Sequence, residues 1–201
     1  NRWLPVIEEI LRENGIPEDF KYLPIAESDL RNLTSPAGAV GYWQFMESTA
    51  EEKGLVVNKQ VDERFDIRKS TRAACEYLKK AYEEFGNWTL VAASYNLGIY
   101  GVKRELRRQE AKSYYDLRLN PETSRYVFRI LAIKEILEHP RQYGFNFKEE
   151  DLYQPYNTKT VEVNSSVPSW VDFAQEHNIT YKTLKVYNPW IQRRSLTNRS
   201  G

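Results

Sequence analysis

The sequence predicts a mainly α-helical domain followed by a smaller module of one strand and two helices. Three observations indicate this fold class. Up to about Gly144 the apolar residues recur at helical spacing, and no stretch alternates convincingly as a strand does. The composition changes after Asn146, where charged residues give way to tyrosine and proline. Residues 160–163 then alternate between polar and apolar side chains, which is typical of a strand.

Residues that start and stop helices divide the first domain. A first apolar pattern ends at residues 14–15, where Asn-Gly favours a helix terminus. Pro24 fits poorly inside a continuous helix, so we expect it to open a new short segment that ends near Ser28. A loop of small residues follows over residues 32–41, and helical character resumes over residues 41–53.

The second half of this domain contains the longer helices. Gly86 is expected to end one of them, Asn87 to cap the next, and Asn120 to cap the last, which begins with a proline. A basic stretch between them fits a solvated surface helix. We expect these helices over residues 70–85, 88–96, 102–109 and 121–139.

The patterns divide the chain into a domain over residues 1–146, a linker over residues 147–159 and a module over residues 160–201. In the module, two short helical patches around Trp170 and Tyr181 follow the expected strand. One strand and two helices bury their apolar faces poorly unless a second strand pairs with the first. Because no closing strand is evident, we expect this module to be truncated.

Composition excludes several classes of protein. With 41% hydrophobic and 13% aromatic residues, the 201-residue chain can bury a substantial core, which excludes a disordered tail. The 29 Lys+Arg against 28 Asp+Glu leave a formal charge of +1, so nucleic acid is not expected as the main ligand. No apolar run reaches the roughly 20 residues of a membrane span.

Chemistry that depends on histidine or cysteine is largely excluded by the residue inventory. The single Cys75 excludes an internal disulfide and a multi-cysteine metal site. Neither His139 nor His177 lies near a plausible nucleophile, so serine and cysteine triads are close to excluded. The single methionine, Met46, is internal, and we expect the sequence to be part of a longer or processed chain.

Glu27 is the strongest candidate for acid–base chemistry. It follows the apolar residues 23–26, and desolvation by such neighbours is expected to raise the pKa of its carboxyl group. A raised pKa suits a general acid that works near neutral pH. The alternative is a solvent-facing glutamate that caps the next loop, which the position of Glu27 also allows.

Three further segments carry residues suited to sugar binding. Residues 35–46 combine small residues, which let a ligand approach the backbone, with the amide of Gln44 beside aromatic rings. Tyr95 and Asn96 end a helix, where they could equally form a C-terminal cap. Tyr126 follows an acidic first turn that helix electrostatics alone explain, and it is most simply a core residue with its hydroxyl satisfied.

Taken together, these segments resemble the lytic transglycosylases of the goose-lysozyme-like (SLT) superfamily, above all the membrane-bound lytic murein transglycosylase D type. The family signatures are E-S near a helix end, S-x-x-G-A-x-G-x-x-Q-x-M, A-Y-N-x-G and E-T-x-x-Y-V. They correspond here to residues 27–28, 35–46, 94–98 and 122–127. The resemblance spans about residues 2–145 and implies a lysozyme-like helical fold for this domain.

The sequence departs from these signatures at three places. Glu47 replaces the proline that usually follows the Q-x-M segment, and Ser94 replaces the usual alanine. Asp29 and Leu30 stand where a small residue and a phenylalanine often follow E-S. None of these changes removes a residue that the family chemistry uses, although Glu47 adds a carboxylate near the expected cleft.

The resemblance implies cleavage of the β-1,4 bond between N-acetylmuramic acid and N-acetylglucosamine in peptidoglycan. Glu27 would protonate the leaving oxygen and then act as base on the muramic C6 hydroxyl, giving a 1,6-anhydro sugar. The substrate's N-acetyl group would stabilise the cation, so one carboxylate suffices and no metal or organic cofactor is implied. The positions implied to bind or orient the substrate are Ser28, Gln44, Met46, Tyr95, Asn96 and Tyr126, with Tyr126 steering Glu27.

Two alternatives stay open at this point. A hydrolytic muramidase on the same fold would need a second acid, such as Asp29 or Glu47, to position water. A non-catalytic wall-binding protein is the other, and it gains weight if Glu47 disables the cleft.

Residues 160–190 resemble a degenerate LysM module, which in its complete form binds N-acetylglucosamine polymers. Binding of glycan and packing against the first domain both stay open as roles. The expected partner of the chain is the peptidoglycan glycan strand, with no nucleic acid and no membrane span in the chain. That substrate implies a location in the periplasm or cell envelope, with a lipid anchor upstream of this sequence as one option.

Overall fold

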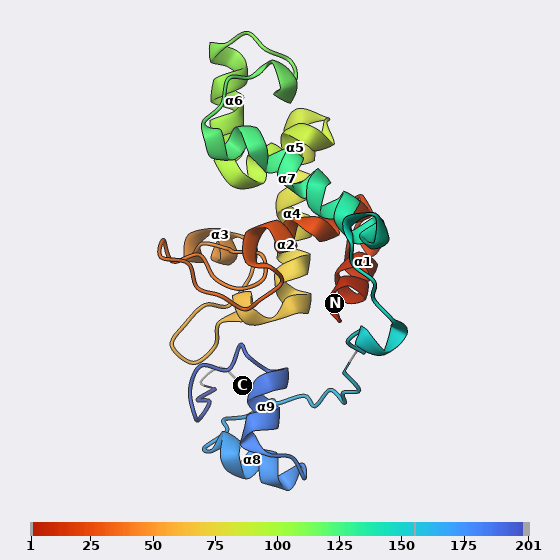
Figure 1. Cartoon of the computed structure of the whole chain (residues 1–201). Helices are drawn as coiled ribbons and strands as arrows, with labels where there is room; N and C mark the ends of the chain where they lie inside the picture. The colour runs from red at the N-terminus through yellow and green to blue at the C-terminus, as the bar shows by residue number, and fades with distance from the viewer. Residues whose placement is uncertain (1, 155, 199–201) are drawn as a thin grey trace.

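The computed structural model describes residues 2–154 and 156–198, and this part of the chain is mostly helical, as predicted (Figure 1). Helices α1 to α7 form the first domain, and α8 and α9 lie in a separate group at the C-terminal end (Figure 1). The α-helices are α1 (Leu4–Glu13), α2 (Leu23–Ser28), α3 (Glu47–Glu52), α4 (Ile67–Phe85), α5 (Trp88–Leu97), α6 (Ile99–Arg108), α7 (Pro121–Glu138), α8 (Trp170–Glu176) and α9 (Tyr181–Tyr187). Short 3-10 turns are η1 (Glu18–Tyr22), η2 (Glu63–Phe65), η3 (Tyr114–Asp116), η4 (Pro140–Tyr143) and η5 (Glu149–Asp151).

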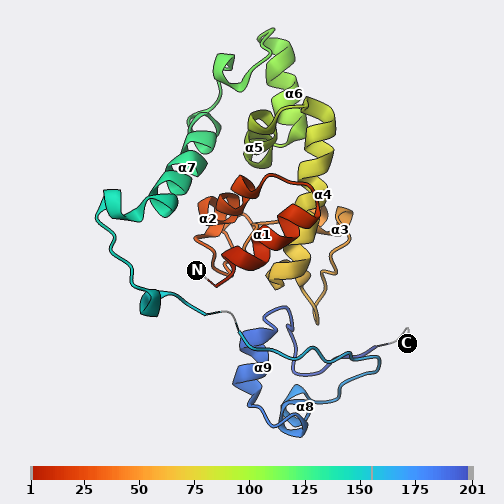
Figure 2. The ribbon, with the colours of Figure 1, turned by 90° about the vertical axis from the view of Figure 1, so that its right-hand side faces the viewer.

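Helix α4 is the longest helix of the described chain, and α1 and α5 pack against it. It begins three residues earlier than predicted, because the Asp66 carboxylate accepts hydrogen bonds from the Arg68 and Lys69 amides and so caps it. It ends at Gly86, in the left-handed conformation, as predicted. Figure 2 shows α4 running behind α1, with α5 and α6 at its far end.

Helix α2 is short, as the position of Pro24 predicts. Pro24 lies in its first turn, where no hydrogen-bond donor is needed, and Asp29 ends it with a left-handed backbone. Its apolar side packs against α7 and η1. The helix therefore delivers its last residues to the junction with α7.

The prediction of a helix over residues 41–53 is wrong for its first half. Only α3 is helical there, and the preceding residues form tight turns with antiparallel bridges that join Val40 to Thr34 and to Phe45. Gly41 has φ +82° and Gln44 has φ +51°, which no helix accommodates. The glycine is required, since a Cβ atom at Gly41 would lie 2.0 Å from the Arg64 carbonyl oxygen. Helix α6 also begins three residues before the expected start at 102.

The core of the first domain joins all of its long helices. Trp43 is fully buried in it, and its indole nitrogen donates to the Thr71 hydroxyl on α4 at 2.9 Å. Side chains that are fully or almost fully buried here include Ile7, Ile10, Leu11, Leu23, Trp43, Leu78, Val91 and Val102.

The C-terminal module contains both expected helices, but the strand expected over residues 160–163 is not formed. Among the described residues that segment pairs with no other strand. Val161 is 43% exposed, and only Val163 is partly buried, against the core of the module. An antiparallel bridge instead joins Val167 to Leu196, through reciprocal hydrogen bonds of 2.8 Å. This isolated bridge joins the two ends of the module, and no strand that pairs with residues 160–163 is formed within the described residues. Its small core contains Val167, Trp170, Ala174, Leu184 and Ile191.

The C-terminal module packs against the first domain. Ile191 forms an antiparallel bridge with Val61, and the flanking hydrogen bonds join the Asp62 amide to the Trp190 carbonyl at 2.9 Å and the Gln192 amide to the Gln60 carbonyl at 2.8 Å. Packing, one of the two roles left open by the sequence, is thus present. Within residues 2–154 and 156–198, no helix combines the length and apolar character of a membrane span.

Candidate active site

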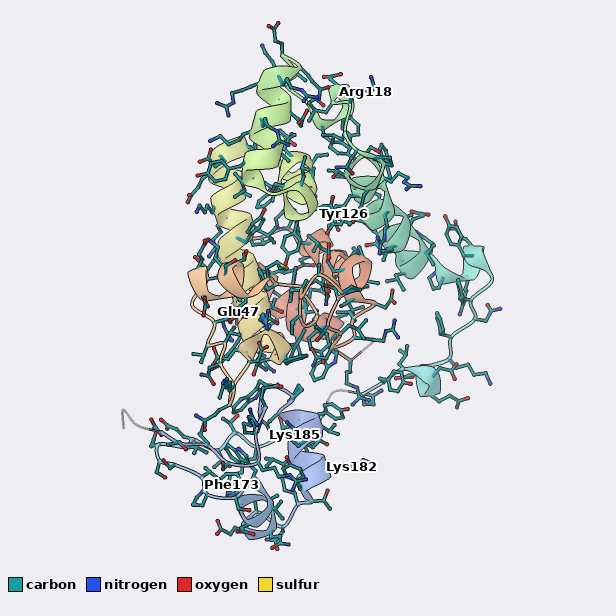
Figure 3. All side chains as sticks on the ribbon, turned by 90° about the vertical axis from the view of Figure 1, so that its left-hand side faces the viewer. Glu47, Arg118, Tyr126, Phe173, Lys182 and Lys185 are labelled. Carbon is teal, nitrogen blue, oxygen red and sulfur yellow. The ribbon has the colours of Figure 1, made fainter. Side chains whose placement is uncertain are left out.

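Glu27 lies at the end of α2, half-buried, and meets Tyr126 of α7. The Tyr126 hydroxyl donates a hydrogen bond to Oε1 of Glu27. Burial raises the pKa of Glu27, while the Tyr126 hydrogen bond and the Arg129 cation oppose that rise and Glu122 adds to it. The raised pKa agrees with the sequence-based prediction and disagrees with a solvent-facing cap. Figure 3 shows Tyr126 between α7 and the N-terminal helices.

Tyr126 itself is 3% exposed, so it cannot be reached freely by water. Burial, followed by the charge of Glu27, raises the pKa of its hydroxyl well above the usual value, which keeps the group neutral. Tyr126 is thus a core residue whose hydroxyl is satisfied by the candidate acid. The two readings of Tyr126 left by the sequence are therefore compatible.

Arg129 is a neighbour of Glu27 that sequence reasoning missed. Its guanidinium donates to the carbonyl of Ala26, the residue before Glu27, and its charge lowers the pKa of the acid. Arg129 follows Tyr126 by three residues on α7, which places both on one helix face. That spacing is the signal from which it could have been found.

Tyr95 connects α5 to the loop before α3. Its hydroxyl donates to the Trp43 carbonyl at 2.8 Å, and its ring lies 5.2 Å from that of Tyr77 in an edge-on arrangement. Burial raises the pKa of Tyr95 well above its usual value, and the charge of Glu27 raises it further. The Tyr95 hydroxyl is therefore within electrostatic range of the candidate acid, and its contact with a substrate stays a prediction.

Asn96 is held by the first turn of α7. Its Oδ1 accepts from the Thr123 hydroxyl at 2.7 Å, and its Nδ2 donates to Glu122 at 3.2 Å. The same Thr123 hydroxyl accepts from Asn120, which caps α7, at 2.8 Å. Asn96 is thus oriented by a network that joins the ends of two helices. Thr123, fully buried, is a second residue that sequence reasoning missed.

Gln44 and Met46 lie on the turns before α3. The Gln44 amide nitrogen donates to the carbonyls of Gly41 at 2.7 Å and Leu33 at 3.1 Å, which fixes the side chain across the loop. Met46 is 45% exposed and so offers an apolar surface to solvent.

Ser28 is placed differently from the expectation. It is 3% exposed, and its hydroxyl faces the carbonyls of Tyr42 at 2.8 Å and Pro24 at 3.0 Å. Because the Ser28 hydroxyl donates its hydrogen to carbonyls inside the domain, Ser28 links the loop that contains Tyr42 to α2. Direct bonding near a sugar, the role implied by the resemblance, does not fit this burial.

The two carboxylates considered as a second acid are both exposed. Asp29 forms an ion pair with Arg31 at 2.9 Å, with 71% of the aspartate side chain accessible. Glu47 is exposed at the start of α3. Figure 3 shows Glu47 on α3, apart from Tyr126 in this view.

A buried ion pair between Asp62 and Arg64 contacts the loop before α3. Nε and Nη2 of Arg64 donate to the two carboxylate oxygens of Asp62 at 2.9 and 2.8 Å, and Nη1 donates to the Phe45 carbonyl at 3.2 Å. Both side chains are almost fully buried.

The comparisons with known proteins agree with this geometry. The family model "Transglycosylase SLT domain" matches residues 5–118, so the chain belongs to the SLT transglycosylase family. Residues 159–201 match the "Soluble lytic transglycosylase C-terminal LysM-like domain". The resemblance stated from the sequence is therefore confirmed for the family and for the fold class.

Among the relatives are the membrane-bound lytic murein transglycosylases D of Escherichia coli strains K12 and O6:H1. Each is 29% identical over 192 residues, which are 92% of this chain and 42% of the relative, so the chain spans less than half of their length. The solved structure of an inactive mutant of the lytic transglycosylase Slt from Pseudomonas aeruginosa is also similar. It has a TM-score of 0.55 at 18% identity and covers 75% of this chain and 26% of that one, which shows the shared fold.

Proposed function

We propose that the chain is a peptidoglycan lytic transglycosylase that uses Glu27 as its single acid–base group. The observation that carries the proposal is the half-buried Glu27 carboxyl, with its raised pKa and its hydrogen bond from Tyr126. A carboxyl group that keeps its proton closer to neutral pH can donate it to a leaving oxygen. Membership of the SLT family and the murein transglycosylase relatives support the same reaction.

The proposed reaction needs two proton transfers at one carboxyl. Glu27 first donates its proton to the β-1,4 glycosidic oxygen, and the C–O bond to the N-acetylmuramic C1 breaks. The N-acetylglucosamine leaves with its C4 hydroxyl restored, while the muramic N-acetyl group stabilises the cation. Glu27, now a carboxylate, takes the proton of the C6 hydroxyl as its oxygen bonds to C1. The 1,6-anhydro ring forms, and Glu27 is protonated again.

The surroundings suit the substrate's own N-acetyl group as the second participant. A retaining or inverting hydrolase pairs its acid with a second carboxylate within about 5 to 10 Å, facing the same bond. Asp29 is paired with Arg31 in solvent and Glu47 is exposed, so neither lies in a comparable environment. This favours the transglycosylase over the hydrolytic muramidase.

We assign binding roles to the residues around the acid. Gln44 and Asn96, each fixed by hydrogen bonds, would bind the hydroxyl and N-acetyl groups of the sugar. Tyr95 would line the site beside the acid, and Met46 would give it an apolar edge. Ser28 would act indirectly, by fastening the loop that carries Gln44.

The same proposal includes the organisation and location of the chain. We propose a catalytic domain over residues 1–146, a linker over residues 147–159 and a LysM-like module over residues 160–201, which accords with the two family matches. We propose a cell-envelope location, because peptidoglycan is there and the Escherichia coli relatives are membrane-bound.

The substitution Glu27→Gln tests the function. The amide can still accept the Tyr126 hydrogen bond, so the variant is expected to stay folded while release of anhydromuropeptides from purified sacculi falls at least 100-fold. Mass spectrometry separates the mechanisms, since an anhydro end lacks the mass of the water found in a reducing end. Wild-type-like turnover by the variant would refute the role of Glu27. Products with reducing ends would indicate the hydrolase, and binding of sacculi without soluble products would indicate a wall-binding protein.

A further inference from the structure

A cavity lies where the C-terminal module meets the first domain. The N-terminal end of α1, the start of α4, the end of the linker and the end of α9 supply its walls. Aromatic side chains dominate the lining: Trp3, Tyr156, Tyr187 and Trp190. The cavity is distinct from the site around Glu27, which does not line it.

The docking of the two parts fixes the shape of this cavity. The Trp190 carbonyl accepts from the Asp62 amide at 2.9 Å, so the residue that supplies one aromatic wall is tied to the first domain. Elsewhere in the lining, the ring centres of Trp3 and Tyr156 lie 5.7 Å apart edge to face, and those of Tyr156 and Tyr187 lie 4.6 Å apart. The walls are therefore held from both sides before any ligand binds, which lowers the entropic cost of binding.

Two arginines give the cavity a positive character. The Arg2 guanidinium lies 3.8 Å from the centre of the Tyr156 ring, and Arg68 is exposed at the first turn of α4. One carboxylate, that of Asp66, also lines the cavity, but it accepts the amides of Arg68 and Lys69 as the cap of α4. A ligand with a carboxylate would therefore meet two cations and an acid that is already hydrogen-bonded.

An adjoining cavity extends the same surface toward α2. It shares Arg2, Trp3, Tyr42 and Tyr156 with the first cavity and reaches Leu30, three residues after Glu27. Tyr42 belongs to the loop that Ser28 fastens to α2. The lining of the two cavities thus runs from the C-terminal module to Leu30, just beyond the end of α2.

We propose that this inter-module cavity is a second binding site for peptidoglycan, one that takes a sugar bearing a carboxylated peptide. Pyranose rings stack on aromatic faces, and peptide carboxylates pair with guanidinium groups. The inference rests on the proposed function, which supplies the ligand class. The site binds a portion of the strand away from the bond that is cut, so it raises affinity for the polymer without taking part in the chemistry.

Binding at this cavity can be followed through its two tryptophans. The probe is the soluble N-acetylglucosaminyl-N-acetylmuramyl tetrapeptide, titrated to saturation or to its solubility limit into the full chain carrying Glu27→Gln. In nitrogen-15 spectra of the indole groups, the signals of Trp3 and Trp190 are expected to shift. Those of Trp88, which stacks on Tyr82, and Trp170, in the core of the module, are expected to stay.

Charge recognition is tested by substitution and by an uncharged ligand. Arg68→Gln is expected to weaken binding of the muropeptide roughly ten-fold, as the loss of one charge-assisted contact predicts. Arg72→Gln, one turn further along α4 and outside the cavity, is the control and should leave the affinity unchanged. Chitotetraose, which has no carboxylate, should bind roughly ten-fold more weakly than the muropeptide.

The outcomes separate this site from the proposed function. If Trp3 and Trp190 do not shift, or if Arg68→Gln binds like the wild type, the second site is refuted even where the wild-type chain releases anhydromuropeptides. Equal affinity for chitotetraose would refute the role of the arginines. If the chain releases no anhydromuropeptides while both tryptophans shift, the proposed reaction fails and the binding site stands.

Discussion

Glu27 and Asp62 are both carboxylates of the first domain that are largely withdrawn from water, and their partners differ. Glu27 accepts a hydrogen bond from a neutral tyrosine, whereas Asp62 meets both donor edges of the Arg64 guanidinium. A neutral partner leaves the acid able to exchange its proton, and burial then raises its pKa. A bidentate cationic partner instead holds a fixed charge pair in one geometry. The Glu27–Tyr126 arrangement suits proton transfer, whereas the Asp62–Arg64 pair suits a structural role that holds neighbouring backbone segments in place.

The fixed pair stands between the C-terminal module and the loop before α3. The Asp62 amide donates to the Trp190 carbonyl, and Arg64 donates to the Phe45 carbonyl. Gly41 approaches the Arg64 carbonyl so closely that it admits no side chain. Substitutions around the Asp62–Arg64 pair should therefore lower the stability of the domain. Substitutions around Glu27 should mainly change the pH dependence of activity.

The largest effect is expected for Arg64→Met. It leaves the Asp62 carboxylate buried without its partner, which costs about 3–5 kcal/mol in the free energy of unfolding. Urea denaturation measures this loss. The control is Arg31→Met, which breaks the exposed pair with Asp29 and should change stability by no more than about 0.5 kcal/mol. Similar losses for both variants would contradict the structural role of the buried pair.

A second test compares two glycines of the same loop. Gly41→Ala and Gly38→Ala both place a side chain at a positive φ, +82° and +87°, so the backbone strain is matched. Only at Gly41 does the new Cβ atom meet the Arg64 carbonyl, at 2.0 Å, whereas Gly38 faces open space. Gly41→Ala should therefore be less stable than Gly38→Ala by about 1–3 kcal/mol in urea denaturation. Equal stabilities would show that the loop moves away from Arg64 at little cost.

The glycines also show where sequence reasoning stops. Caps and helix ends at Pro24, Asn87 and Asn120 depend on neighbouring residues in the chain, and the helices they bound were predicted well. The turns around Gly41 depend on a contact with Arg64, more than 20 residues away, so local pattern suggested a helix there.

Part of the candidate site could also be predicted from the sequence, and part could not. The raised pKa of Glu27 follows from its apolar neighbours in the sequence, and the family pattern pointed to Tyr126. The role of Thr123 depends on the meeting of α5 and α7, which no local pattern encodes. Arg129 could have been found from its spacing to Tyr126, but its contact with the Ala26 carbonyl on α2 could not. The burial of Ser28 and the pairing of Val167 with Leu196 were missed for the same reason.

Tyr126→Phe tests the role of the neutral tyrosine as the hydrogen-bond partner of Glu27. The ring is kept, but the hydrogen bond that favours the Glu27 carboxylate is lost, so the pKa of Glu27 should rise further. Activity that needs the protonated acid should then persist to higher pH, while kcat near neutral pH falls about ten-fold as the acid loses its orientation. A pH profile of anhydromuropeptide release measures both effects.

The matched control for Tyr126→Phe is Tyr114→Phe. The Tyr114 hydroxyl also bonds to α7, at the Thr123 and Ser124 carbonyls, but makes no hydrogen bond to Glu27. The Tyr114→Phe variant should have a lower free energy of unfolding but an unchanged pH profile of activity. An equal movement of the profile in both variants would show that the tyrosine acts through general packing.

The smallest effect is expected from the charges around Glu27, whose removal should displace the pH profile of activity. The Arg129 cation lowers the pKa of Glu27 and the Glu122 anion raises it. Because the protonated acid starts the reaction, Arg129→Gln should move the alkaline limb of the pH profile upward, and Glu122→Gln should move it downward. Added salt should shrink both displacements, since both charges lie at exposed positions. Displacements in the same direction would mean that these residues affect catalysis through the helix ends they hold, and not through the field at Glu27.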